Sequence, residues 1–319
     1  MEIKITIDDA NRRLDKFLFS LLGGAGQSFI YKMLRKKRIK LNGGRADGHE
    51  ILQEGDVIKL YLSPETIDGF RTAREIPAAQ PLVGIIHEDE NMLVVNKPAG
   101  LASHGGMASG DHLLARILYY LYKTGVYSPD ATFAPAICNR LDMNTSGVVI
   151  CGKNLRTLQN INAAFKNREA QKEYLAVVDG IMGQPGESKT LTGLYQKDTS
   201  INKATIIPNS PQGKLPPTIH EGQQPSEAIT AYTILATASG KTLLNINPIT
   251  GRSHQIRAHM AAIGHPLCGD KKYGGKPTPH APAQLLHCHK ITIAGRTFEA
   301  TPPQNFSSGL QEIFGRDVW

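Results

Sequence analysis

The feature that most constrains this chain is a pair of charged residues placed directly before a buried strand. Val148–Cys151 is an apolar, mostly β-branched run, which predicts a strand with both faces covered. Arg140 and Asp142 stand just before it on either side of Leu141, and a polar turn follows at residues 144–147. An isolated buried charge is very costly, so this pair must be ion-paired, solvated or functional.

Length and composition indicate a globular chain. With 319 residues it can bury a full core and is expected to hold two domains. No apolar run approaches the ~18 residues of a membrane helix, so no membrane partner is expected. The net charge of +8 is compatible with a polyanionic partner but also with solvated lysines. The chain has four cysteines, Cys138, Cys151, Cys268 and Cys288. They lack CxxC spacing, which favours the reducing cytoplasm. We expect the protein to be a monomer.

Three ordered stretches resemble the motifs of the RluA-type pseudouridine synthases. Arg140-Leu141-Asp142 followed by Thr145-Ser146-Gly147 resembles the family signature. The KEYLA run at residues 172–176 is similar to the second motif, and TGRSHQIRAH at 250–259 is similar to the third. The resemblance covers roughly residues 83–302. Asn139 stands where the family usually has histidine, and we expect this change to be tolerated.

The pattern of strands and helices predicts an α+β catalytic domain. Strands outnumber helices after residue 82, which favours a largely antiparallel mixed sheet flanked by helices, and the resemblance implies the pseudouridine synthase fold. Helices are expected at Leu155–Phe165 and Ser253–Ile263, because apolar residues recur there at helical spacing. Residues 180–225 are rich in glycine and proline, and a mobile loop is expected near Pro208–Gln224.

The N-terminal residues 1–62 form a helix–helix–strand–turn–strand block that resembles the S-four-type RNA-binding domain. Ser28 is the expected N-cap of its second helix. Cations crowd one side and the end of that helix, which is the electrostatic footprint of a phosphate-binding surface: Lys32, Arg35, Lys36, Lys37 and Arg38. A solvated helix face is the alternative. Residues 63–81 show little apolar periodicity and are expected to be a linker to a catalytic domain at 82–319.

Asp142 is the expected catalytic carboxylate. The reaction implied by the resemblance breaks the glycosidic bond of a uridine, turns the base over and rejoins it through carbon. It needs no redox change, metal or cofactor, but it does need a carboxylate beside an oxocarbenium-like sugar. A structural salt bridge or a turn-capping aspartate is the alternative for such a residue.

Arg257 and Tyr174 complete the expected catalytic group. An arginine near Asp142 would counter the rise in carboxylate pKa that burial causes, and the resemblance assigns this role to Arg257. His254 is expected on the same helix face as Arg257, with Ile256 facing the core. The resemblance assigns stacking on the uracil, or proton transfer, to Tyr174. A phenol is a poor base at neutral pH, so stacking is the more secure role; a core tyrosine is the alternative.

Arg140 is expected to contact the flipped nucleotide or fill the vacated base stack, since the target base must leave the stack to be reached. A strand at Ile137–Leu141 would place it on the side of Asp142; pairing with a carboxylate is the alternative. Lys97, in a Lys-Pro-x-Gly turn, has either a structural role or a substrate contact. No metal site is expected, because the histidines and cysteines in the last third lack zinc-ligand spacing.

The sequence therefore predicts an RNA pseudouridine synthase that acts on ribosomal RNA of the large subunit, the usual substrate of family members with this architecture. A transfer-RNA substrate remains an alternative. A non-catalytic ribosome-assembly factor would be favoured by loss of Asp142, Tyr174 or Arg257, and all three are present. A nucleoside hydrolase would need two carboxylates at the site, and one is evident.

Overall fold

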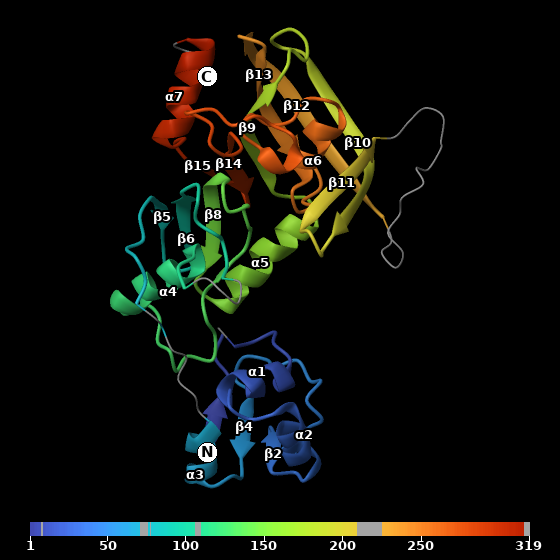
Figure 1. The fold of residues 1–319 in the computed structure, drawn as a ribbon. Helices are drawn as coiled ribbons and strands as arrows, with labels where there is room; N and C mark the ends of the chain where they lie inside the picture. Colours follow the sequence, from blue (N-terminus) through green and yellow to red (C-terminus); the bar gives the residue numbers. More distant parts are fainter. Residues whose placement is uncertain (8, 71–75, 77, 106–109, 209–224, 316–319) are drawn as a thin grey trace.

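The structure is a computed structural model of the chain and describes residues 1–7, 9–70, 76, 78–105, 110–208 and 225–315. Figure 1 shows a small N-terminal lobe and a larger lobe built on one extended sheet. The lobes touch at Thr132, whose carbonyl accepts hydrogen bonds from Arg12 and Ser20 and whose hydroxyl donates to Asp9.

The N-terminal lobe packs helices against a four-stranded sheet in the order β1-β4-β2-β3. Its core consists of apolar side chains from α1 (Leu14–Leu21), α2 (Gln27–Arg35) and the strands, as their helical and alternating periods predict. The strands are β1 (Glu2–Lys4), β2 (Ile39–Leu41), β3 (Gly44–Arg45) and β4 (Val57–Leu60). The prediction that Ser28 caps α2 is wrong, because the helix begins at Gln27 with Gly26 as its N-cap.

A helix occupies the start of the segment predicted to be a linker. Pro64–Phe70 forms α3, and its Ile67 is buried in the N-terminal core with Phe70 beside it. The Thr66 amide donates to the Ser63 hydroxyl, as at a capped helix start. The packed N-terminal unit therefore extends to Phe70 rather than ending at residue 62.

The large lobe contains an 11-stranded sheet in the order β11-β10-β12-β13-β9-β14-β8-β6-β5, with β15 beside β14 and β7 beside β8. Among the strand pairs of the described residues, β8 and β14 alone are parallel, so the sheet is largely antiparallel, as predicted. The strands are β5 (Ile85–Glu88), β6 (Met92–Lys97), β7 (Ala136–Ile137), β8 (Ser146–Gly152), β9 (Gln171–Asp179), β10 (Ser188–Asp198), β11 (Lys203–Pro208), β12 (Ser226–Ala238), β13 (Lys241–Pro248), β14 (Leu286–Ile293) and β15 (Arg296–Glu299).

The predicted central strand is β8, and all of its residues are buried. Gly147 lets it lie close to β14, since a Cβ there would stand 2.1 Å from the Cys288 carbonyl oxygen. Gly147 also has φ +122°, a conformation that favours glycine. Only glycine therefore fits at position 147, where the polar turn leads into the sheet.

The two faces of the sheet carry different helices. Leu175 and Val177 on β9 pack against α7 (Gln304–Phe314), whereas Tyr174, Ala176 and Val178 point to the opposite side. That opposite side is covered by α4 (Leu113–Lys123), α5 (Leu155–Lys166) and α6 (Gln255–Ala262). Tyr174 thus lies on the same face as the helix that carries Arg257.

The predicted helix at 155–165 is confirmed by α5, and the predicted helix at 253–263 is confirmed by α6, which begins two residues later. The predicted mobile loop falls mostly on residues 209–224, which lie outside the described residues. Within the part of the chain that the structure describes, no helix combines the length and apolar character needed to cross a bilayer.

Candidate active site

The three predicted catalytic residues line one cleft. Asp142, Tyr174 and Arg257 all contribute to a cavity of about 1020 Å³, and Arg140 lies on its lining as well. They come from distant parts of the sequence: the turn before β8, strand β9 and helix α6. The fold therefore brings together the residues that the sequence singled out.

The backbone around Asp142 is fixed from both sides. The buried Ser103 hydroxyl donates to the Leu141 carbonyl at 2.7 Å and accepts from the Leu141 amide at 3.0 Å. On the other side, the Lys97 ammonium donates to the Met143 carbonyl at 3.0 Å. Asp142 itself is half-buried, and its carbonyl accepts from the Thr145 amide. These hydrogen bonds fix the backbone on both sides of Asp142, whose carboxylate lines the cleft.

Lys97 has a structural environment rather than a position in the cleft. It is fully buried, and its ammonium also donates to the carbonyls of Pro98 and Leu101. Burial lowers the pKa of Lys97 to about 7, although the nearby Asp142 carboxylate counters the shift. Its three bonds use all three ammonium donors and tie the Lys-Pro-x-Gly turn to the residue after Asp142.

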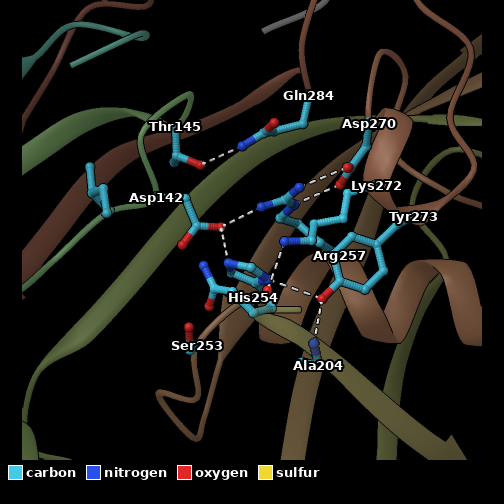
Figure 2. Close-up of polar contacts among 12 residues, drawn as sticks. Asp142, Thr145, Ala204, Ser253, His254, Arg257, Asp270, Lys272, Tyr273 and Gln284 are labelled. Carbon is cyan, nitrogen blue, oxygen red and sulfur yellow. Dashed lines mark hydrogen bonds and ion pairs between the residues drawn. The ribbon is translucent and has the colours of Figure 1, made fainter. Parts of the chain in front are cut away.

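Arg257 joins the Asp142 carboxylate to a second, buried carboxylate. Its Nη1 donates to Asp142 Oδ2 at 3.0 Å, while its Nε and Nη2 donate to the two oxygens of Asp270 at 2.7 and 2.8 Å (Figure 2). Asp270 is 1% exposed. Both carboxylates raise the pKa of Arg257, against the effect of its burial. The guanidinium is therefore a fixed cation beside Asp142.

Two residues that sequence reasoning did not commit to complete the polar network. His254 Nε2 lies 3.9 Å from Asp142 Oδ2, and its Nδ1 lies 3.0 Å from the Tyr273 hydroxyl (Figure 2). The Arg257 guanidinium carbon lies 5.0 Å from the centre of the Tyr273 ring. His254 was expected inside the helix, but it is the N-cap residue of α6 in a left-handed conformation. Ile256 faces the core, as predicted.

Asp270 and Tyr273 lie in a glycine-rich turn whose sequence gives little signal. The turn carries the 3-10 helix η1 (Lys271–Tyr273) and approaches other backbone segments closely. A Cβ on Gly269 would stand 2.2 Å from the Ala283 carbonyl oxygen, and one on Gly275 would stand 1.9 Å from that of Leu267. Close backbone approach of this kind cannot be read from a single sequence.

Tyr174 is almost completely buried and is one of the residues that line the cleft. Burial, with a contribution from the Cys288 thiol, raises the pKa of Tyr174 well above its usual value. The phenol therefore stays protonated at neutral pH. This favours the predicted stacking role over the predicted role as a base.

Arg140 is exposed at the cleft, but the expected strand at residues 137–141 is wrong, because β7 ends at Ile137. Among the described residues Arg140 has no carboxylate partner.

Asn139 links this segment to β8 where strand pairing has ended. Its side-chain amide group donates a hydrogen bond to the Val148 carbonyl and accepts one from the Ile150 backbone amide. One side chain with both a donor and an acceptor thus docks this segment on β8.

Lys172 is a further cation of the cleft that the motif contains but the sequence did not assign. It lies two residues before Tyr174 on the same face of β9. Burial lowers its pKa, and its Nζ is 5.5 Å from the Phe165 ring centre. No carboxylate among the described residues pairs with it. Other cations on the cleft lining are Lys166, Arg168, Lys197, Arg252 and Lys272.

The predicted RNA-binding cations of the N-terminal lobe are all exposed. Lys32 and Arg35 lie in the last turn of α2, and Lys36, Lys37 and Arg38 follow it. The Lys37 and Arg38 amides donate back to the Leu34 and Met33 carbonyls, with Lys37 at φ +57°. This is the Schellman arrangement, here with lysine in place of the usual glycine.

The histidines and cysteines considered for a metal site do not converge. His287 is bonded to the Ser146 hydroxyl and the Ala300 carbonyl, and burial lowers its pKa to about 4. The Cys268 thiol donates to Asp179 instead. Among the residues described, no group of three or more such side chains is arranged to hold a metal.

Comparisons with known proteins agree with this geometry. Residues 91–262 match the family model for RNA pseudouridylate synthase, and residues 12–58 match that of the S4 domain. The chain is 31% identical to Ribosomal large subunit pseudouridine synthase C of Pasteurella multocida over 298 residues, covering 91% of this chain and 84% of the relative. The synthase C of Rickettsia bellii is 34% identical over 315 residues, covering 95% and 96%.

Solved structures support the fold. Human RNA Pseudouridylate Synthase Domain Containing 4 gives a TM-score of 0.56 at 21% identity, over 72% of this chain and 92% of that one. Domain Containing 1 gives 0.52 at 22% identity, over 69% and 83%. The chain therefore belongs to the RNA pseudouridylate synthase family, in its RluA-type group, and carries an S4 domain at its N-terminus.

Proposed function

We propose that this protein converts specific uridines of large-subunit ribosomal RNA to pseudouridine, with Asp142 as the catalytic carboxylate. The observation that carries the proposal is the Asp142–Arg257 pair, 3.0 Å apart, in a cleft that also contains Tyr174. The choice of RNA follows the relatives, which are named ribosomal large subunit pseudouridine synthases.

The proposed chemistry is an isomerisation, so uridine and product have the same composition. The C1′–N1 bond breaks, the uracil turns over, and C1′ bonds to C5. The proton on C5 then passes to water and N1 takes a proton from water, so neither an oxidant nor a metal enters the balance. Asp142 faces C1′ as positive charge develops there and stabilises it either covalently or electrostatically.

Arg257 orients this carboxylate in the proposed site. Its position is itself fixed by the bidentate bond to Asp270, so Asp142 meets a cation that cannot swing away. Because the cleft excludes part of the solvent around Asp142, a fixed charge there acts more strongly than it would in water.

Tyr174 stacks on the flipped uracil in this proposal. Tyr174 lines the cleft, and the raised pKa of its phenol keeps it neutral during the reaction. Arg140 lies exposed at the rim, where its side chain can fill the stack that the base leaves. Flipping costs a few kcal/mol, which such contacts offset.

The N-terminal unit supplies RNA affinity in this proposal. The five exposed cations at the end of α2 contact phosphates and position the RNA without reading its bases. The enzyme works in the cytoplasm, and its four cysteines are free thiols. Its monomeric state stays a prediction.

The test is a direct conversion assay. Purified protein is incubated with unmodified large-subunit ribosomal RNA or with unmodified transfer RNA, in buffer containing a chelator, and nucleosides are quantified by chromatography. The proposal expects pseudouridine at discrete positions in the ribosomal RNA. Conversion of transfer RNA alone would overturn the substrate assignment, and no conversion of either RNA would overturn the activity.

A further inference from the structure

Both polar partners of Asp142 approach the same oxygen. Arg257 Nη1 donates to Oδ2 at 3.0 Å, and His254 Nε2 lies 3.9 Å from that same atom. Figure 2 shows the two contacts converging on it. Among the described residues, no hydrogen bond or ion pair involves Oδ1. The arrangement therefore holds one oxygen of the carboxylate and leaves the other turned to the cleft.

The protonation of His254 follows from its neighbours. The backbone amide of Ala204 donates to the Tyr273 hydroxyl oxygen at 2.8 Å, and His254 Nδ1 lies 3.0 Å from the same hydroxyl. Of these two partners, only Nδ1 can accept the hydroxyl hydrogen, and it does so in the tautomer that leaves Nδ1 unprotonated. A neutral imidazole that accepts at Nδ1 carries its proton on Nε2, the nitrogen that faces Asp142.

The surroundings also keep His254 neutral. Burial lowers the pKa of His254, and the cations of Arg257, Lys272 and Lys197 lower it further, against the effect of Asp142. Burial raises the pKa of Tyr273 to about 12, so its hydroxyl keeps the hydrogen that it donates. The tautomer is therefore maintained around neutral pH.

The backbone of His254 is left-handed at this position, with a φ of 56° and a ψ of 17°. Histidine, like asparagine and aspartate, adopts this region more often than other residues with a side chain. The conformation turns the imidazole from the start of α6 toward Asp142.

We propose that His254, oriented by the Tyr273 hydroxyl, is a positioning residue that holds Asp142 Oδ2 so that Oδ1 faces the ribose of the flipped uridine. This assignment rests on the proposed function for the ribose contact. Tyr273 acts on both partners of Asp142, because its hydroxyl orients His254 and its ring lies against Arg257. The turn at residues 270–273 is thus the element that sets the direction of the carboxylate.

The first test measures the tautomer without RNA. Nitrogen-15 NMR of imidazole-labelled protein reports which ring nitrogen carries the proton, and comparison with His254→Gln assigns the signal among the 11 histidines. The expected result is a proton on Nε2 in the wild type and a mixture of tautomers in Tyr273→Phe. A proton on Nδ1 in the wild type would overturn the proposal whether or not the protein modifies RNA.

The second test separates chemistry from binding. Single-turnover rates and RNA dissociation constants are measured for Tyr273→Phe, His254→Asn and His254→Gln, with His280→Gln, an exposed histidine, as the control. Losing the contact that positions Asp142 should slow the chemical step about tenfold or more, with RNA affinity unchanged. Asparagine tolerates the left-handed backbone but does not reach Asp142, whereas glutamine restores a donor near the Nε2 position.

The expected order of rates is therefore wild type, then His254→Gln, then His254→Asn. If both His254→Asn and Tyr273→Phe kept the single-turnover rate and melting temperature of the wild type, the proposal would be wrong. Loss of RNA affinity with an unchanged chemical rate would assign His254 to binding instead. An inactive wild-type protein would contradict the proposed function. The NMR test is independent of that outcome, because it measures the tautomer of His254 without RNA.

Discussion

Asp142 and Arg257 meet through one nitrogen and one oxygen, Nη1 and Oδ2, at 3.0 Å. The remaining donors of the guanidinium fork that face a carboxylate are taken by Asp270. Arg257 is therefore anchored by one aspartate and presented to the other. This division distinguishes a structural carboxylate, which is buried, from a carboxylate that faces the cleft.

Replacing Asp270 by asparagine should destabilise the fold and slow the reaction. The change leaves a buried guanidinium without its bidentate partner, which costs about 3 kcal/mol of unfolding free energy. Urea denaturation measures the loss. The control is Asp111→Asn, which breaks a bidentate but more exposed pair with Arg116 and should cost less than about 1 kcal/mol. Equal effects at the two sites would show that burial does not decide the strength of these pairs.

Neutralising the end of α2 should weaken RNA binding in a way that depends on salt. The logarithm of RNA affinity falls linearly with the logarithm of salt concentration. In Lys36→Gln/Lys37→Gln, each lost phosphate contact should make this slope less steep by about 0.7 to 0.9. Affinity measured between low and moderate salt gives this slope. Lys4→Gln, an exposed lysine at β1, is the control and should leave it unchanged. An unaltered slope in the double variant would remove the N-terminal cations from the interface.

Replacing Lys172 by methionine should stabilise the protein and impair the enzyme. Its pKa is lowered by burial, so folding is penalised at neutral pH by the charged form. Removing the charge while keeping the length should raise the unfolding free energy by about 1 kcal/mol. RNA affinity or turnover should fall, because the cation faces the cleft beside Tyr174. A variant that loses stability and keeps full activity would mean that Lys172 serves the fold alone.

Tyr174 should remain protonated far into the alkaline range. Since its pKa lies well above the usual value near 10, its phenol should not ionise between pH 8 and 10. The difference in ultraviolet absorbance between the wild type and Tyr174→Phe follows this group during a pH titration. A wild-type protein with one extra tyrosinate in that range would restore the role of Tyr174 as a base.

Much of the fold was predictable because it follows from periodicity. The apolar run that became β8 and the helical pattern of α5 lie where the sequence indicated. The helix α3 was missed, although Ser63-Pro64-Glu65 is a typical helix start, because only Ile67 and Phe70 supply apolar contacts. The order of strands depends on long-range pairing, which local patterns do not encode.

The site was predictable only where a motif carried it. Asp142, Tyr174 and Arg257 stand in segments that resemble family motifs, and they line one cleft. Asp270 and Tyr273 lie in a turn without apolar periodicity, so nothing in the sequence linked them to Arg257. His254 was expected on the helix face, yet it lies in a left-handed conformation at the N-cap, before the helix. Such contacts depend on backbone approach, which requires the structure.

If Asp142 is the carboxylate that meets the ribose, Asp142→Asn should abolish most of the chemical step. The substitution keeps the size and one acceptor beside Arg257 but removes the charge. Single-turnover conversion of large-subunit ribosomal RNA should fall by about a thousandfold or more, with RNA affinity and melting temperature close to those of the wild type. Pseudouridine formation by Asp142→Asn at a rate within tenfold of the wild type would contradict the account.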